Sequence, residues 1–215
     1  AHPARDVALF VLPNLYGSPA HHSYFDLFTL TTVPATVNAL GEPIRTIDWG
    51  IKNYVEGAVY VGILPLILAA FGLMAGRRAD RIYRFTFAGI GLVALTFMFG
   101  LPTYALLLNT LPGFNQLHSP FRWIFALTAC IAVLAGFGWD ALANHPRAAR
   151  RLGFGLIGAG GLILAGVIVS RVVYVSIEPL LTRVVTSLAL ADRAFADARM
   201  FYSYQFANIL IFGVV

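Results

Sequence analysis

The sequence of 215 residues has little charge. Charged residues make up 12% of the chain, whereas soluble domains carry roughly 25%. Hydrophobic residues make up 59%, and the mean hydropathy is +0.76. These values exclude an ordinary water-soluble domain and indicate a chain that is solvated mainly by lipid.

Cysteine and lysine are nearly absent. The single cysteine, Cys130, excludes an intrachain disulfide and a thiolate metal site, and we interpret it as a small buried hydrophobe. Lys52 is the only lysine among 15 basic residues, and the net charge is +5. Because the arginines stand in short loops between apolar stretches and not on one accessible face, this charge does not indicate nucleic-acid binding.

The sequence also lacks an initiating methionine and the pattern of a signal peptide, and its last residue lies inside an apolar run. We therefore expect the chain to be an internal portion of a longer polytopic protein. Gly153, Gly155 and Gly158 have the spacing of a dinucleotide-binding loop, but no strand precedes them. We interpret them as helix-packing glycines, and the sequence implies no cofactor.

Four uncharged apolar stretches, each near the ~20 residues that a bilayer core requires, predict membrane-spanning helices. They cover residues 58–76, 85–111, 123–139 and 152–170. Apolar residues alternate with charged ones from Glu178 to Met200, which predicts an amphipathic helix. The expected fold class is therefore all-α, a polytopic transmembrane helix bundle with extracytoplasmic loops and an amphipathic outer helix.

Arginines indicate the orientation of these spans. They cluster at 77–84 and 147–151, and the positive-inside rule places such loops in the cytoplasm. Alternation then makes residues 1–57 and 176–204 extracytoplasmic. The predicted organisation is an extracytoplasmic segment at 1–57, a four-helix transmembrane region at 58–175, an extracytoplasmic amphipathic segment at 176–204, and the start of a fifth transmembrane helix at 205–215.

Two polar rims stand at the predicted outer ends of the spans. Asn53, Tyr54 and Glu56 precede the first span, where a carboxylate near an apolar region can bind a cation or act as a base. The alternative is that the tyrosine anchors at the interface and that the carboxylate is simply solvated. In the second rim, Arg122 and His118 could hold the phosphate of a lipid-linked substrate, or Arg122 could snorkel to ordinary lipid phosphates.

Other polar residues carry less information. His21, His22 and Asp26 are metal-ligand types, but adjacent histidines point apart and no distant third ligand is indicated, so we predict no metal site. Arg171, near the outer end of the fourth span, could bind an anion or snorkel, and snorkelling is favoured. No residue is identified as catalytic.

The two rims carry a resemblance to a known family. The first runs from Asn53 through Gly62 and Pro65 into an arginine-rich turn, and the second runs from Leu111 through Pro120 and Arg122 into a helix ending Gly136-Phe137-Gly138. In order, spacing and topology, residues 5–145 resemble the YfhO-type bacterial membrane proteins of the C-type glycosyltransferase superfamily. His118 departs from the pattern, because a basic residue, often arginine, is expected there.

The resemblance implies an enzyme of the bacterial cytoplasmic membrane that moves a sugar from a polyprenyl-phosphate donor to an extracytoplasmic acceptor. Its catalytic aspartate would lie upstream of Ala1. The alternative is a non-catalytic scaffold or accessory subunit that packs against partners in a larger membrane complex. A transporter is disfavoured, because no charged residue lies deep inside the four stretches.

Overall fold

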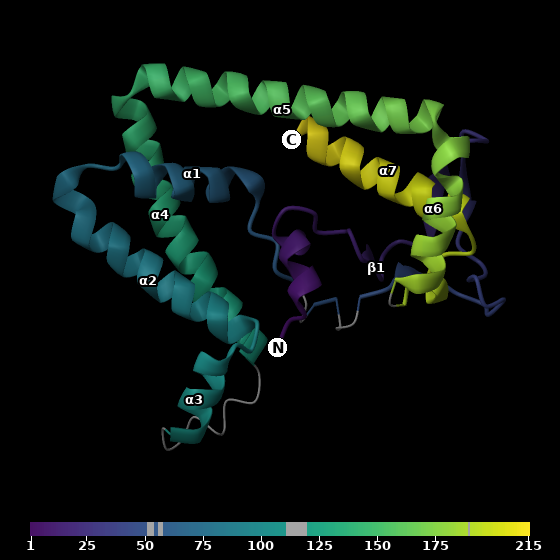
Figure 1. The fold of residues 1–215 in the computed structure, drawn as a ribbon, viewed down its shortest axis with the longest axis horizontal. Helices are drawn as coiled ribbons and strands as arrows, with labels where there is room; N and C mark the ends of the chain where they lie inside the picture. Colours follow the sequence, from purple (N-terminus) through teal and green to yellow (C-terminus); the bar gives the residue numbers. More distant parts are fainter. Residues whose placement is uncertain (51–53, 56–57, 111–119, 189) are drawn as a thin grey trace. The chain divides into compact units, whose positions relative to one another are not determined.

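The computed structural model describes residues 1–50, 54–55, 58–110, 120–188 and 190–215. They form two compact units. The first unit comprises Ala1–Val11 and Glu56–Gly153, and the second comprises Leu12–Val55 and Phe154–Val215. The chain is mostly helical, which confirms the prediction of a mainly helical fold (Figure 1).

The first unit is built around α4 (Ile124–Asn144), on which α1 (Ile63–Ala75) and α2 (Arg81–Met98) both pack. The helix α3 (Pro102–Thr110) follows α2, while the short 3-10 helices η2 (Arg78–Asp80) and η4 (Pro120–Trp123) precede α2 and α4. A further 3-10 helix, η1 (Ala4–Phe10), packs its last two residues against the core. The buried core contains Val59, Ala69, Ala94, Met98, Leu127, Ile131 and Leu134.

Glycine lets α1 and α4 approach until their backbones touch. A Cβ added to Gly138 would overlap the carbonyl oxygen of Leu68, and one added to Gly72 would lie 2.7 Å from the Gly138 nitrogen. Small residues at such positions allow the backbones of two helices to come into contact. The position of α1 on α4 therefore depends on these two glycines.

The corner between α1 and α2 is held by one arginine. Arg84 is 5% exposed, and its Nη1 donates hydrogen bonds to the carbonyl oxygens of Gly72 at 2.7 Å and Leu73 at 2.9 Å. Its Nη2 donates to the carbonyl of Arg77 at 3.0 Å. The Gly72 and Arg77 carbonyls also accept backbone hydrogen bonds, from the amides of Gly76 and Asp80. A carbonyl oxygen has two lone pairs, so the Arg84 guanidinium adds a second donor at these positions and ties the end of α1 to α2.

The second unit combines small sheets with helices. The strands β1 (Gly17–Ser18) and β4 (Ile47–Asp48) form one antiparallel pair, and β2 (Ser23–Asp26) and β3 (Thr31–Pro34) form another. The helices are α5 (Pro146–Val172), which begins in the first unit, α6 (Tyr174–Ser187) and α7 (Ala198–Val214), with the 3-10 helix η5 (Ala191–Arg193) between the last two. The helix α7 packs on β2 and α6. Trp49, Phe195 and Phe201 fill the centre, with ring centroids 5.0–6.2 Å apart.

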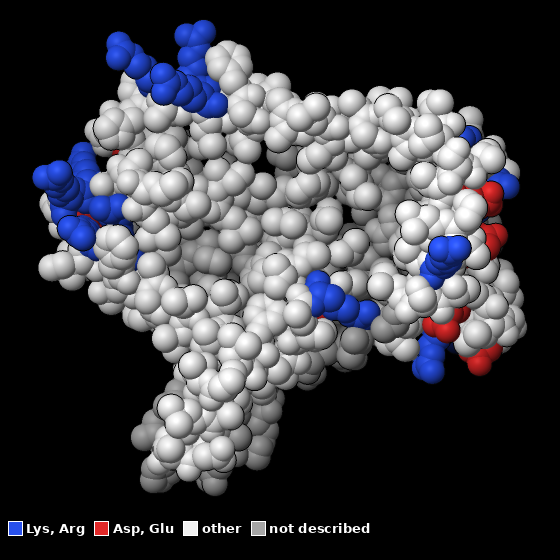
Figure 2. Space-filling model, viewed as in Figure 1, with Lys and Arg blue, Asp and Glu red and all other residues white. Residues whose placement is uncertain are grey.

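Three described helices are long and apolar enough to cross a membrane: Arg78–Met98, Pro120–Asn144 and Pro146–Val172. They correspond to the second, third and fourth predicted spans. On the face shown in Figure 2, charged atoms gather near the start of α5, and its middle has none. The first predicted span is not matched, because α1 has 13 residues and a bilayer core requires about 20. Gly62 adopts φ +96°, which is not a helical conformation, so α1 starts only at Ile63.

The all-α prediction is wrong for residues 17–48, which contain the four strands. The physical reason is local. Val33 and Thr32 are β-branched and lie opposite the aromatic residues Tyr24 and Phe25 in the ladder, a composition typical of strands. The sequence analysis predicted no strands in this segment.

Two predicted helices are interrupted. The stretch 85–111 breaks between α2 and α3, where Gly100 adopts φ +65° and Pro102 starts a new helix. The single amphipathic helix predicted from Glu178 to Met200 is also wrong. It divides at Leu190, which has a left-handed φ of 70°, and α7 then starts afresh from Asp197, whose carboxylate accepts from the Met200 amide at 2.8 Å.

Substitution of alanine for Gly138 should destabilise the first unit. The new methyl group would have to displace the α1 backbone, and overpacking of this kind costs about 1–3 kcal/mol or more. Gly136 is the matched control, because it lies on the same helix and a Cβ there meets nothing within 4 Å. We expect Gly138→Ala to lower the thermal unfolding midpoint in detergent and Gly136→Ala to leave it unchanged or raise it. Equal midpoints would show that the α1–α4 contact is not tight.

Candidate functional site

Arg122, the arginine of the second predicted rim, lies at the start of a candidate membrane-spanning helix. It belongs to η4, immediately before α4, and its side chain is exposed. Its neighbour Trp123 packs edge-on against Phe97 of α2, with ring centroids 4.9 Å apart. This contact fixes η4 on the unit. Within the described part of the chain, no carboxylate pairs with the Arg122 guanidinium, which is therefore available to an anion.

A buried histidine and carboxylate lie next to this rim. His2 Nδ1 is 2.7 Å from Asp6 Oδ2, and the two residues are 3% and 5% exposed. The His2 ring is 6.4 Å from that of Phe121, in an edge-on arrangement, so the residue before Arg122 packs directly on the pair. The pair thus supports η4, and its burial keeps it from solvent.

The other predicted rim residues are only partly described. Asn53, Glu56 and His118 lie outside the described residues. Tyr54 is described, and its hydroxyl donates to Asn14 Oδ1 at 3.3 Å within the second unit. Arg122 belongs to the first unit. No contact between the predicted residues is therefore described, and their shared role stays a prediction.

A second polar cluster, which the sequence did not reveal, lies in the second unit. Asp26, at the end of β2, is 4% exposed and accepts two hydrogen bonds from Arg199 of α7. Arg199 Nη2 is 2.6 Å from Oδ2, and Nε is 3.1 Å from Oδ1. Asp26 also accepts from the Phe28 amide at 3.0 Å and from the Thr29 hydroxyl at 2.9 Å. This bidentate pair joins residues 173 positions apart in the sequence.

The ionisation of Asp26 follows from these contacts. Burial raises the pKa of its carboxyl, but the hydrogen bonds from Arg199, the Phe28 amide and Thr29, together with the charge of Arg199, outweigh burial and lower the pKa below its usual range. The hydrogen bonds that Arg199 donates to the Asp26 carboxylate raise the pKa of Arg199. Asp26 is thus a carboxylate that is held ionised, which suits a structural anchor better than a general base.

Two guanidinium groups lie against the Phe28 ring. That of Arg199 is 4.6 Å from the ring centroid, and that of Arg171, in the last turn of α5, is 4.3 Å away. Tyr174 packs edge-on against the same ring at 4.6 Å, and its burial, followed by the nearby charge of Glu178, raises its pKa to about 12. Whereas Arg199 is neutralised by Asp26, no carboxylate of the described residues pairs with Arg171.

The residues of metal-ligand type do not converge. His21 Nδ1 is 2.7 Å from the Tyr204 hydroxyl, His22 Nδ1 is 2.8 Å from the Arg45 carbonyl, and Asp26 is bound to Arg199. Across residues 1–50, 54–55, 58–110, 120–188 and 190–215, no three His, Cys, Asp or Glu side chains are grouped to hold a metal ion.

The sequence did not predict the His2–Asp6 hydrogen bond or the Asp26–Arg199 ion pair, for different reasons. His2 and Asp6 are only four residues apart, so their contact is local, but His2 lies before η1 and no helical pattern in the sequence predicts it. No sequence pattern predicts the Asp26–Arg199 pair, because only the tertiary fold brings β2 and α7 together. Comparisons with protein-family models, curated proteins and solved structures gave no match.

Replacement of Asp26 by asparagine should weaken the second unit and reduce its sensitivity to acid. A lowered carboxyl pKa contributes stability above the unfolded value of about 3.9, and this contribution is lost as the pH falls through the folded value. Because Arg199 is 40% exposed, we expect a loss of roughly 1–2 kcal/mol near neutral pH, below the 3–5 kcal/mol of fully buried pairs.

Thermal unfolding in detergent at about pH 7, 5 and 3.5 would measure both effects. The midpoint of the unmodified chain should fall between the two acidic conditions, and the difference from Asp26→Asn should shrink. Asp140→Asn is the matched control, because Asp140 is exposed and unpaired among the described residues. A constant difference at all three pH values would contradict an ionised Asp26.

Proposed function

We propose that the chain belongs to a membrane glycosyltransferase that takes a sugar from a polyprenyl-phosphate donor on the extracytoplasmic face of the bacterial cytoplasmic membrane. The observation that supports this proposal is Arg122. It is an exposed guanidinium without a carboxylate partner among the described residues, at the end of an apolar helix long enough to span a bilayer.

The chemistry of this position suits a lipid-linked phosphate. A guanidinium binds phosphate oxygens through two parallel hydrogen bonds, and such charge-assisted bonds are roughly twice as strong as neutral ones. Trp123 beside it is half-buried and aromatic, a residue type enriched at the headgroup level of membranes. A donor whose polyprenyl tail lies in the bilayer would present its phosphate at this depth.

Arg171 supports the same assignment independently. It lies in the last turn of α5, and the predicted alternation of spans assigns it to the outer side together with Arg122. Its guanidinium stacks on Phe28 at 4.3 Å and has no carboxylate partner among the described residues. Stacking on an aromatic ring holds a guanidinium in place and leaves its N–H groups free to donate.

Replacement of Arg122 by alanine in the full-length protein should lower sugar transfer from a polyprenyl-phosphate donor about tenfold or more, because hydrogen bonds to charged groups contribute about 1.5–3 kcal/mol. Donor turnover in liposomes is the measurement. Arg183→Ala is the matched control, since Arg183 is exposed on α6 and has no side-chain partner among the described residues. Unchanged transfer by Arg122→Ala would remove Arg122 from the mechanism.

A scaffold or accessory subunit is the second candidate, and α5 is the observation that favours it. Only Val167 of its 27 residues is buried. Cβ atoms added to Gly153, Gly155, Gly158, Gly161 or Gly166 would meet nothing within 4 Å. A long apolar helix with open glycines can accept a partner helix at close range.

Gly158→Leu separates the two candidates. The space around Gly158 is open, so the isolated chain should keep its thermal midpoint. If α5 packs against a partner, Gly158→Leu should reduce recovery of a stoichiometric complex in native mass spectrometry. A scaffold also predicts that neither the parent chain nor the variant transfers sugar. Full recovery of the complex would count against the scaffold.

A further inference from the structure

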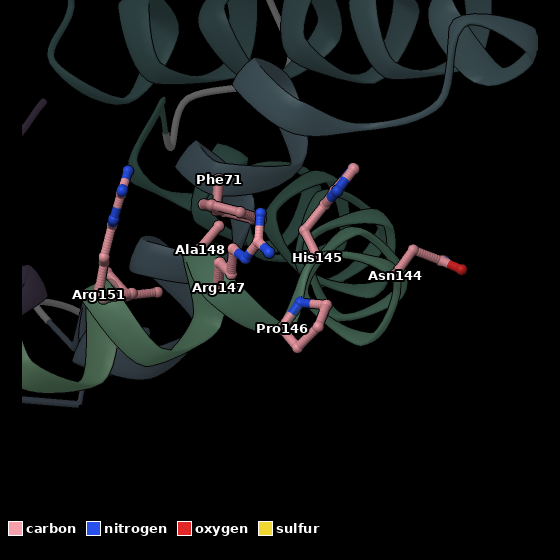
Figure 3. A pocket seen from close by; sticks show the side chains of 8 residues that line it. Phe71, Asn144, His145, Pro146, Arg147, Ala148 and Arg151 are labelled. Atoms are coloured by element: carbon pink, nitrogen blue, oxygen red, sulfur yellow. The ribbon is translucent and has the colours of Figure 1, made fainter.

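An open pocket of about 890 Å³ lies in the first unit, at the turn between α4 and α5. Asn144, His145 and Pro146 form the turn, the first residues of α5 form one wall, and α1 contributes a single aromatic ring. The lining residues are Phe71, Asn144, His145, Pro146, Arg147, Ala148, Arg151 and Leu152. In Figure 3, Arg147 extends toward the Phe71 ring, whereas His145 and Asn144 extend away from it.

The polar part of this lining is cationic. Arg147 and Arg151 are one helical turn apart on α5, so their side chains rise from the same face. Both are exposed, and neither has a hydrogen-bond or ion-pair partner among the described residues. No aspartate or glutamate lines the pocket. Two guanidinium groups without a counter-charge create a site for an anion that offers several oxygen acceptors.

The remaining lining is apolar, which favours an amphiphilic anion over a free inorganic phosphate. Phe71, Ala148 and Leu152 present carbon atoms beside the arginines. A free inorganic phosphate would leave this apolar surface uncovered, whereas an amphiphilic anion would cover it while its phosphate meets the guanidinium groups. The pocket also lies at the end of α4 and the start of α5, two helices long enough to reach a membrane surface.

We propose that this pocket binds the phosphate headgroup of an anionic phospholipid, with Arg147 and Arg151 on the phosphate and with Phe71 and Leu152 against the glycerol and the first acyl carbons. Basic pockets between membrane helices on the cytoplasmic side bind headgroups of this kind. The arginine distribution predicts the cytoplasmic side for this turn, so the site is separate from the outer-face site of the proposed function and does not depend on it.

The test measures binding of dioctanoyl phosphatidylglycerol to the full chain in a neutral detergent by native mass spectrometry. Dioctanoyl phosphatidylcholine serves as the uncharged headgroup, and inorganic phosphate serves as the free anion. We expect phosphatidylglycerol to bind preferentially and Arg147→Gln/Arg151→Gln to lower its affinity about tenfold or more. Both side chains are exposed, so the variant should keep the helical content of the parent chain.

Arg77→Gln/Arg78→Gln is the matched control. It removes the same charge from the other arginine-rich loop, where both residues are exposed and do not line the pocket. The proposal requires this control to keep the parent affinity. Equal losses in the two double variants would overturn it in favour of general surface attraction. Inorganic phosphate that competes with phosphatidylglycerol at equal concentration would overturn the lipid assignment and identify the ligand as a free phosphate.

Discussion

The apolar surface of the three long helices constrains everything else in this molecule. Within the chain, the most apolar windows of Arg78–Met98 and Pro120–Asn144 are each 28% buried, and that of Pro146–Val172 is 6% buried. A helix on the surface of a water-soluble protein would cover its apolar stripe and expose a polar face. Here the exposed faces are themselves apolar, so the helices need lipid or the helices of another protein around them. Polar chemistry is consequently restricted to the helix ends and to the segments between them.

Those segments gain their order from contacts between distant parts of the sequence. In the second unit, Asp26 and Arg199 connect β2 to α7, and Trp49 packs against Phe195, which precedes α7, and against Phe201 of α7. The chain builds this unit from 12–55 and 154–215, with most of the first unit between them in sequence. Neither half of the second unit contains both members of this ion pair, so residues 12–55 require Arg199 of the other half to neutralise the buried Asp26 carboxylate.

Composition predicted the apolar helices well, because a long uncharged stretch has few alternatives to a helix in lipid. Their interruptions were harder to predict. Gly62, Gly100 and Leu190 all adopt positive φ. The number of apolar residues in a stretch gives no information about such backbone conformations. The strands were missed because Ser23–Asp26 and Thr31–Pro34 have four residues each, too few for a clear alternation. Of the predicted site residues, Arg122 is exposed, and its role stays a prediction. The Asp26–Arg199 pair could not be inferred from spacing, since its members are 173 positions apart.

The nearly exclusive use of arginine gives a way to separate structural from ligand-binding cations. Arg84 donates hydrogen bonds to three backbone carbonyls, and Arg199 donates hydrogen bonds to a carboxylate. Both use the planar, multi-donor geometry that lysine lacks. Arg122, Arg147 and Arg151 have the same geometry but no such partner among the described residues. The fork of a guanidinium matches the oxygens of phosphate and carboxylate groups. The two proposed sites therefore rest on arginines at the ends of long apolar helices whose donors are not taken up by the fold among the described residues.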